Sequence, residues 1–454
     1  MATGDLRVAV FLVAGASPLA LLGDGGSALL VPSLAIAFAL AWVPIAALTA
    51  ELASALPIRT AHYAWGRVAF GSGWGFVWAW WRLLVAVFDV GLCAAPIAWL
   101  VRSAGVAPDA PGRIVAFALV LAIGCAIAVQ PRLVWLLAFA GAVALPIAIA
   151  LASGAPRDTA TWPGADAVAA AIGLMTAMRG ADIAGVVAGE VGDSRRSISR
   201  GIAIGSGFVA VLLVGTLALA SVGIWPLAGN IDASGTRALS TAAALVALCA
   251  HGGIGISVAS RLVGAIAIDR YLPAGFAQSG AGQPTQMTTV VVTAIAAASA
   301  LLDDVLLRAC VTVAWCASLG ALVGSLQVVR VSRPRHARGY RIPGGTQAVA
   351  MCGAIAVAAA VVSVVDGLLS GGVTWAIAGA MCIVSGPIAW IGLTILVKRG
   401  RPNFPLALEP ALRWFDPAQP GVPELVAPSV PKAPFAARLE SLVPRHRRGE
   451  SARV

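Results

Sequence analysis

Two charged side chains stand beside a glycine inside a long apolar segment of this chain. Arg179, Gly180 and Asp182 follow the apolar run 165–178, and the apolar turn 183–188 comes after them. A charge at bilayer depth costs several kcal/mol and usually marks a binding site or a pathway. A glycine at the same place predicts an interrupted helix, and interrupted helices near the midplane form the binding sites of many secondary transporters. These residues therefore predict ligand binding.

Arg179 has three interpretations at the sequence level. It pairs with the carboxylate of a substrate, or it neutralises Asp182 while the site is empty, or it is a structural partner of Asp182 that never meets a ligand. All three satisfy the same requirement, because a buried charge needs a partner. The sequence leaves them open.

Other ionisable residues also lie in apolar segments. Arg82 and Asp89 are seven residues apart, so on a helix they project from one face about 10 Å apart. They line a pathway, or each pairs with another helix. His251 titrates near neutral pH or is a hydrogen-bonded packing residue. Glu51 and Glu190 lie near segment ends, where salt bridges with loop arginines are expected.

Catalytic chemistry has little support in the sequence. It contains no metal-ligand cluster, no nucleophile–base arrangement and no phosphate-binding loop. The seven cysteines are scattered, mostly in apolar runs, without metal-ligand spacing, and are expected to be packing residues. We expect no enzyme activity, no cofactor and no metal.

The composition indicates that lipid is the solvent of most of this protein. Hydrophobic residues make up 59% of its 454 residues and charged residues only 11%, against roughly 25% charged in soluble chains. The net charge of +11 comes from short arginine clusters between apolar runs. No basic groove is evident, so we expect no nucleic-acid partner.

Twelve apolar runs are long enough to span a bilayer, which takes roughly 20 residues. They are 7–31, 33–56, 74–101, 113–130, 132–152, 165–189, 201–223, 237–265, 287–303, 305–329, 346–368 and 373–397. With both termini in the cytoplasm, seventeen Lys and Arg residues flank the inner side and five the outer side. This asymmetry follows the positive-inside rule and predicts a multi-pass protein of the cell membrane.

Aromatic residues and the chain end complete this organisation. Trp74, Trp78, Trp80 and Trp81 crowd the start of the third span and are expected to anchor it at the membrane interface. We expect residues 1–398 to form the membrane domain. Residues 399–454 are rich in proline and end in basic residues, so a disordered cytoplasmic tail is expected there.

A second interruption is predicted in the first span. Gly15, Ala16, Ser17 and Pro18 follow one another, and proline removes a backbone donor and clashes with the preceding turn. The first and sixth spans are corresponding elements of two five-helix halves, and paired interruptions of this kind point to a site between repeats. The alternative is that glycine and proline are simply common in membrane helices.

Four stretches, in the right order, resemble motifs of the amino acid–polyamine–organocation superfamily. They are the acidic-Leu-Ala-Ser and Trp-rich region Ala50–Trp81, the Glu-Val stretch Ala188–Arg196, the Ser-Arg … Leu-Pro segment Ser260–Pro273, and the loop Arg338–Gly345. The resemblance implies an all-α fold of twelve transmembrane helices, built as a five-plus-five inverted repeat with helices 1 and 6 broken.

The resemblance also implies a function and a site. The implied function is secondary active transport of an amino acid by alternating access, with H⁺ or Na⁺ as a possible coupling ion. The implied substrate site comprises Gly15, Ala16, Ser17, Met178, Arg179, Gly180, Ala181 and Asp182. The first three would hold the substrate carboxylate, and the carbonyls of the others its amine. A carboxylate at the Asp182 position is often linked to gating or proton sensing in that superfamily.

Two alternatives remain at this stage. A polyamine or another organic amine is one alternative substrate, although Arg179 disfavours a dication. A non-transporting amino acid sensor of the same fold is the other. It is motivated by a first break poor in glycine and by Ala181, which stands where many relatives have an aromatic residue.

Overall fold

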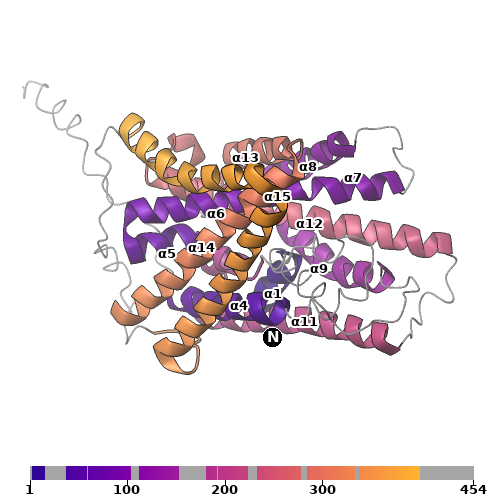
Figure 1. Ribbon diagram of the computed structural model, residues 1–454, viewed down its shortest axis with the longest axis horizontal. Helices are drawn as coiled ribbons and strands as arrows, with labels where there is room; N and C mark the ends of the chain where they lie inside the picture. The colour runs from indigo at the N-terminus through magenta and orange to yellow at the C-terminus, as the bar shows by residue number, and fades with distance from the viewer. Residues whose placement is uncertain are drawn as a thin grey trace, which may run out of the picture. The chain divides into compact units, whose positions relative to one another are not determined.

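The computed structural model describes residues 3–15, 37–58, 60–103, 112–152, 180–191, 193–222, 233–277, 284–332 and 337–398. Within these ranges every regular element is a helix and no strand occurs (Figure 1). These helices belong to one compact unit that lies within Met1–Arg413. The expected all-α class therefore holds for the described residues. The expected tail, 399–454, lies outside them.

The elements follow one another in the order shown in Figure 1. They are α1 (Thr3–Gly15), η2 (Phe38–Trp42), α4 (Val43–Ala55), α5 (Ala61–Phe70), α6 (Ser72–Leu92), α7 (Ala94–Ser103), α8 (Gly112–Val129), α9 (Leu133–Ala152), η3 (Ile183–Glu190), α11 (Ser194–Val222), α12 (Ala233–Ile268), η4 (Ala274–Phe276), α13 (Gln286–Ser299), α14 (Asp304–Ser332) and α15 (Gly345–Leu396).

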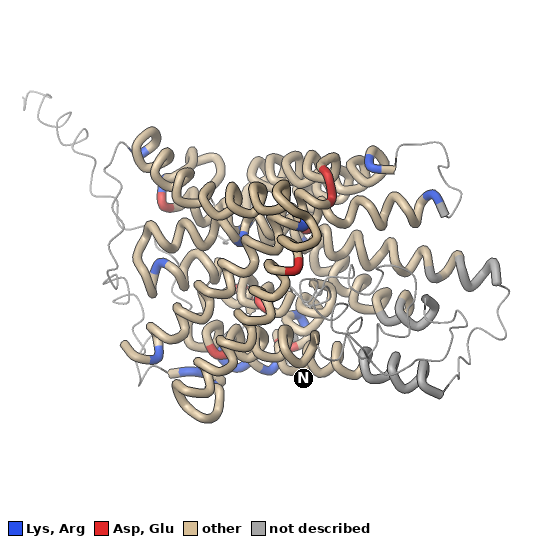
Figure 2. The backbone as a smooth tube through the Cα atoms, in the orientation of Figure 1, with Lys and Arg blue, Asp and Glu red and all other residues tan. Residues whose placement is uncertain are grey.

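Six described segments are long and apolar enough to cross a membrane. They are Phe38–Ala55, Ser72–Arg102, Gly112–Val129, Thr241–Ile268, Asp304–Ser332 and Gly345–Leu396. Leu133–Leu145 and Gln286–Ser299 are shorter apolar helices. Most Lys and Arg positions lie toward one end of the helices, on the left of Figure 2. The chain is thus a membrane protein with several long apolar helices.

Two predicted spans meet at a backbone kink in α15. This helix has 52 residues, which at 1.5 Å per residue is roughly 78 Å, more than twice the thickness of a bilayer core. Gly372 interrupts it with a φ of 59° and a ψ of −147°, a conformation that favours glycine. The kink lies where the sequence separates the runs 346–368 and 373–397.

A π-helical turn, η2, precedes α4 at the start of another span. Pro44 lies at the beginning of α4 and has no N–H to offer the turn before it. The N–H of Val43 instead reaches back five residues to the carbonyl of Phe38. The wider turn is the local consequence of a proline inside an otherwise continuous apolar helix.

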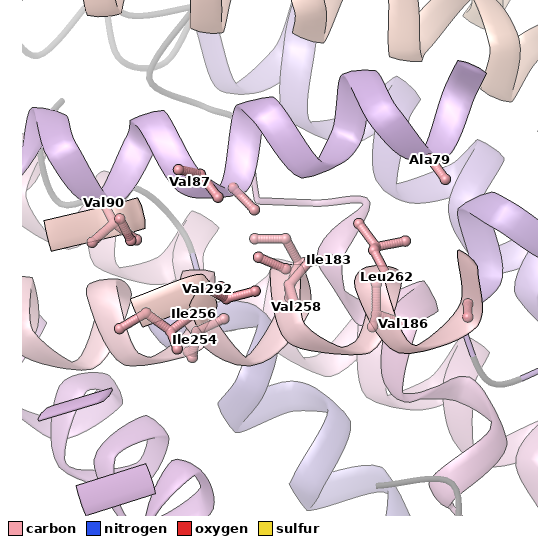
Figure 3. Packing of buried hydrophobic residues seen from close by; sticks show 14 of the residues in the cluster. Ala79, Val87, Val90, Ile183, Val186, Ile254, Ile256, Val258, Leu262 and Val292 are labelled. Carbon is pink, nitrogen blue, oxygen red and sulfur yellow. The ribbon is translucent and has the colours of Figure 1, made fainter. Parts of the chain in front are cut away.

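Helix α6 lies at the centre of the packing. It contacts α5, α12, α13, α14 and α15, which are far apart in the sequence. A large cluster of buried hydrophobic side chains draws on α6, η3, α12 and α13. Figure 3 shows side chains of α6, η3 and α12 gathered between α6 and α12. Any charged group on these faces is therefore surrounded by apolar side chains.

The tryptophans of α6 hold it against its neighbours. Trp78 is only 1% exposed, so the prediction that it anchors the helix at the membrane interface is wrong. The indole N–H groups of Trp78, Trp80 and Trp81 all donate to other helices. Their acceptors are Ser318 Oγ at 2.8 Å on α14, and Ser385 Oγ at 3.0 Å and the Ile383 carbonyl at 3.1 Å on α15. Polar contacts of this kind bind helices together in lipid.

Close packing of α8 against α13 gives a first prediction. A Cβ added at Gly124 would overlap the Oγ1 and Cγ2 atoms of Thr293, a side chain whose hydroxyl is bonded to the Thr289 carbonyl. We expect Gly124→Ala to destabilise the protein by about 1–3 kcal/mol through overpacking. The matched control is Gly320→Ala in α14, where no atom lies within 4 Å and alanine favours the helix. Thermal unfolding in detergent measures both, and equal shifts would contradict the prediction.

Candidate functional site

The described part of the predicted sixth-span interruption is a turn followed by a 3₁₀ helix. The N–H of Ile183 donates to the Gly180 carbonyl, and that of Gly185 to the Asp182 carbonyl, both at 3.1 Å. Element η3 continues this geometry for eight residues. Runs of 3₁₀ helix longer than three or four residues are uncommon and often mark a functional hinge or strain. Met178 and Arg179 lie outside the described residues.

Asp182 is the centre of a buried group of charged side chains that we call the Asp182 cluster, formed with Arg82 and His62. Arg82 approaches the carboxylate with Nε 2.7 Å from Oδ2 and Nη2 3.3 Å from Oδ1. The Nε2 atom of His62 lies 3.0 Å from Oδ2. All three residues are at most 2% exposed. Nη2 donates a hydrogen bond to Oδ1, whereas Nε makes a close charge contact that lacks hydrogen-bond geometry.

The short helix α5 brings His62 to Asp182. It begins after Thr60, whose φ of 66° is left-handed, and ends at Gly71 with a φ of 92°. The His62 ring lies 5.5 Å, between centroids, from both Trp65 and Trp78. These aromatic rings and the core on α6 enclose the Asp182 cluster in an apolar environment.

The end of α1 lies against η3. A Cβ added at Gly15 would sit 3.3 Å from the Cδ1 atom of Ile183, and the two elements pack together along their length. The structure thus places Gly15 next to the turn that contains Gly180, Ala181 and Asp182. The other predicted residues of the first break, Ala16 and Ser17, lie outside the described residues, so their role remains a prediction.

A second buried pair lies further along α6. The Nε2 atom of His251, on α12, is 2.9 Å from Oδ2 of Asp89, and the two side chains are 4% and 9% exposed. Both Arg82 and Asp89 therefore pair with residues outside α6: Arg82 with Asp182, directly before η3, and Asp89 with His251 of α12. Whether these residues also line a pathway remains a prediction.

Both glutamates near the segment ends form salt bridges, but of their arginine partners only Arg338 lies in a loop. Glu51 accepts from Arg330 Nε at 2.7 Å, from Arg338 at 3.2 Å and from the Ile342 N–H at 2.9 Å. Burial lowers the pKa of Arg338, and the nearby Glu51 acts in the opposite direction. The partner of Glu190 is a helix residue rather than a loop arginine. These pairs join α4 to α14 and to the loop that precedes α15.

The partner of Glu190 is Arg261 of α12. Its Nε and Nη2 atoms lie 2.7 and 3.1 Å from the two carboxylate oxygens. Asp269, just after α12, is held by Arg67 of α5 at 2.7 Å and by the Tyr63 hydroxyl. The ends of η3, α5 and α12 are thus joined by charged side chains.

The sequence did not identify His62 as a residue of the site. It lies in the short segment between two predicted spans, where a histidine has no periodic or motif signal. The available signal was its position directly before Tyr63. Nothing in that pattern identifies Asp182 as its partner.

Comparisons with known proteins add no assignment to this geometry. No protein-family model matches the chain, and no curated protein matches it either. Among the described residues, no group of three or more His, Cys, Asp and Glu side chains is placed to hold a metal ion. What the site does must therefore be argued from the buried charges themselves.

Proposed function

We propose that this chain is a secondary active transporter of amino acids that works by alternating access in the cell membrane. The proposal includes twelve membrane-spanning helices in a five-plus-five inverted repeat, with helices 1 and 6 broken and both termini in the cytoplasm. The observation that carries it is the Asp182 cluster, a buried group of charges at an irregular turn beside the end of α1. Charges inside an apolar bundle are costly and usually mark a binding site or a pathway.

An amino acid zwitterion suits the chemistry of this turn. The backbone N–H groups after Gly15 would face the substrate carboxylate, and the carbonyls of 178–182 its amine, because helix ends carry opposite partial charges. Arg82 and Asp182 carry opposite charges, so the neighbourhood has little net charge. A neutral zwitterion enters such surroundings at lower cost than a dication does, which disfavours the polyamine alternative.

The sensor alternative is supported by one feature of the Asp182 cluster. Both carboxylate oxygens of Asp182 are already engaged by Arg82 and His62, so this carboxylate is satisfied without a ligand. A protein that only binds its ligand would need no rearrangement of this contact. A transporter must break or shift it during each cycle, because the residues that enclose the site have to open in turn to each side.

Uptake into proteoliposomes tests the proposal, with Arg179→Ala as the informative variant. We expect saturable uptake or exchange of at least one amino acid from a panel of amino acids, polyamines and related amines. Arg179→Ala should abolish it while the protein remains in the membrane, if Arg179 pairs with the substrate carboxylate as proposed. Arg308→Ala, at an exposed position of α14, is the matched control and should transport normally.

The possible outcomes separate the alternatives. No saturable flux of any compound would overturn the transport proposal. Ligand binding without flux, detected as a thermal shift of the purified protein, would favour the sensor. Unchanged kinetics of Arg179→Ala would remove Arg179 from the substrate site.

A further inference from the structure

We propose that the Asp89–His251 pair is a proton-binding site that couples substrate movement to a proton gradient. This inference rests on the proposed transport function and adds the identity of the coupling ion. The pair joins α6 to α12, the two helices whose facing side chains form much of the buried core.

The geometry leaves one position on His251 open to a proton. With Asp89 ionised, the 2.9 Å contact requires a proton on Nε2, which donates to Oδ2. The other ring nitrogen, Nδ1, is buried and has no hydrogen-bond partner among the described atoms. A neutral imidazole carries a lone pair there. Protonation of Nδ1 therefore turns the neutral ring into an imidazolium without breaking the bond to Asp89.

The surroundings make this protonation energetically significant. In the unprotonated pair, the ionised carboxylate of Asp89 contacts a neutral ring. Protonation of His251 turns this contact into an ion pair, in which the two opposite charges attract each other strongly because the surroundings have a low dielectric. A small, mainly apolar cavity is lined by the residues that follow Asp89 and His251 in the chain, Val90 and Gly252, but not by the pair itself.

The elements packed against α12 bring few other charges near His251. Elements α9, α13 and η4 contain no acidic or basic side chain. The ionisable residues of the others are Asp5 and Arg7 of α1; His62, Tyr63 and Arg67 of α5; Arg82 and Asp89 of α6; Arg102 of α7; Arg113 and Cys125 of α8; and Glu190 of η3, while Cys93 and Cys249 lie beside the cavity. Among these, Asp89 is the carboxylate in contact with His251.

Several of these carboxylates and cations have partners elsewhere. Arg82 and His62 contact Asp182, and Arg67 contacts Asp269. Glu190 contacts Arg261, and Arg113 contacts Asp304.

Helix α6 connects the proton site to the proposed substrate site. Asp89 is seven residues from Arg82, about 10 Å along a helix, and Arg82 holds Asp182. A change in the attraction between Asp89 and His251 acts on the helix that also carries Arg82. Suppose that the proton and the substrate both bind more tightly to the same arrangement of α6. Each then strengthens the binding of the other, because the coupling between two binding sites is reciprocal. In each cycle His251 takes one proton from one side of the membrane and releases it to the other.

Proteoliposomes with an imposed pH gradient test the proton site. The probe is a mixture of tritium-labelled standard L-amino acids. Two assays are run: counterflow against the same unlabelled mixture without a gradient, and net accumulation with an acidic exterior. Wild-type protein is expected to show both. His251→Gln keeps a hydrogen-bond donor for Asp89, but an amide side chain does not take up a proton near neutral pH. This variant should retain counterflow, and its gradient-driven accumulation should be at least tenfold lower than that of wild type.

The controls separate this proposal from the one it rests on. His446→Gln, the same substitution in the Pro-rich tail, should behave like wild type. Proton uptake on addition of the labelled mixture to detergent-solubilised protein, followed with a pH-sensitive dye, should disappear in His251→Gln alone. Counterflow in wild type without any response to the gradient, or full accumulation by His251→Gln, would overturn the proton site while leaving transport intact. Absence of counterflow in wild type would overturn transport itself, and the coupling with it.

Discussion

Arg82→Ala is expected to destabilise the protein by about 3–5 kcal/mol, because it leaves the carboxylate of Asp182 buried without its cation. Asp182 is 2% exposed, so water cannot replace the guanidinium unless the bundle opens. His62 remains as a hydrogen-bond partner, but a neutral imidazole does not compensate the charge. Equilibrium unfolding in mixed detergent micelles measures the loss. Uptake should fall together with stability.

Two further variants show whether the loss comes from an uncompensated charge. The double variant Arg82→Ala with Asp182→Ala removes both charges and should recover much of the stability, since the penalty belongs to the unpaired group. Arg113→Ala breaks a pair whose side chains are 39% and 33% exposed, and should cost no more than about 1 kcal/mol. Equal losses for Arg82→Ala and Arg113→Ala would contradict the interpretation.

Glu51→Ala is expected to have an effect of similar size, about 3–5 kcal/mol, by leaving buried cations without a counter-charge. Its side chain is fully buried, and that of Arg330 is only 1% exposed. The same carboxylate also accepts from the N–H of Ile342, so the loop before α15 loses an anchor as well. Limited proteolysis of this loop, combined with unfolding in detergent, measures both consequences.

Glu51→Gln is the graded control for this position. Glutamine keeps an acceptor for the Ile342 N–H but carries no charge, so its stability should fall between those of wild type and Glu51→Ala. A loss below about 1 kcal/mol in Glu51→Ala, the size typical of exposed pairs, would mean that water reaches the arginines. Faster cleavage of the loop without any loss of global stability would restrict the role of Glu51 to anchoring.

Local patterns in the sequence predicted the helices and some of their ends. The apolar runs locate the long helices, because a membrane requires about 20 apolar residues in each. The gap between 346–368 and 373–397 predicted the place of the kink at Gly372. The expected twelve-helix repeat extends over residues outside the described ranges and stays a proposal.

The partners of the buried charges could not be predicted in the same way. Two interpretations of Arg179 make it a partner of Asp182, and they stay predictions because Arg179 lies outside the described residues. The structure shows a partner that the sequence did not suggest, Arg82, a hundred residues earlier. Which face of a helix meets which neighbour depends on rotation and tilt, and apolar runs without a polar face do not specify either. The prediction that Trp78 lies at the membrane interface was wrong for the same reason, since an indole suits both a buried contact and a lipid interface.

Helix α5 has a consequence for how the bundle can open. Within ten residues it reaches three neighbours: His62 bonds to Asp182, Arg67 to Asp269, and the Trp65 indole to the Leu56 carbonyl at 2.9 Å. Moving α5 outward by a small amount would strain all three contacts. Their polar groups gain new hydrogen-bond partners only when water fills the space that α5 leaves. Partial displacement is therefore costlier than either end state. We therefore expect the three contacts of α5 to break together, so that the part of the bundle around α5 opens in one cooperative step.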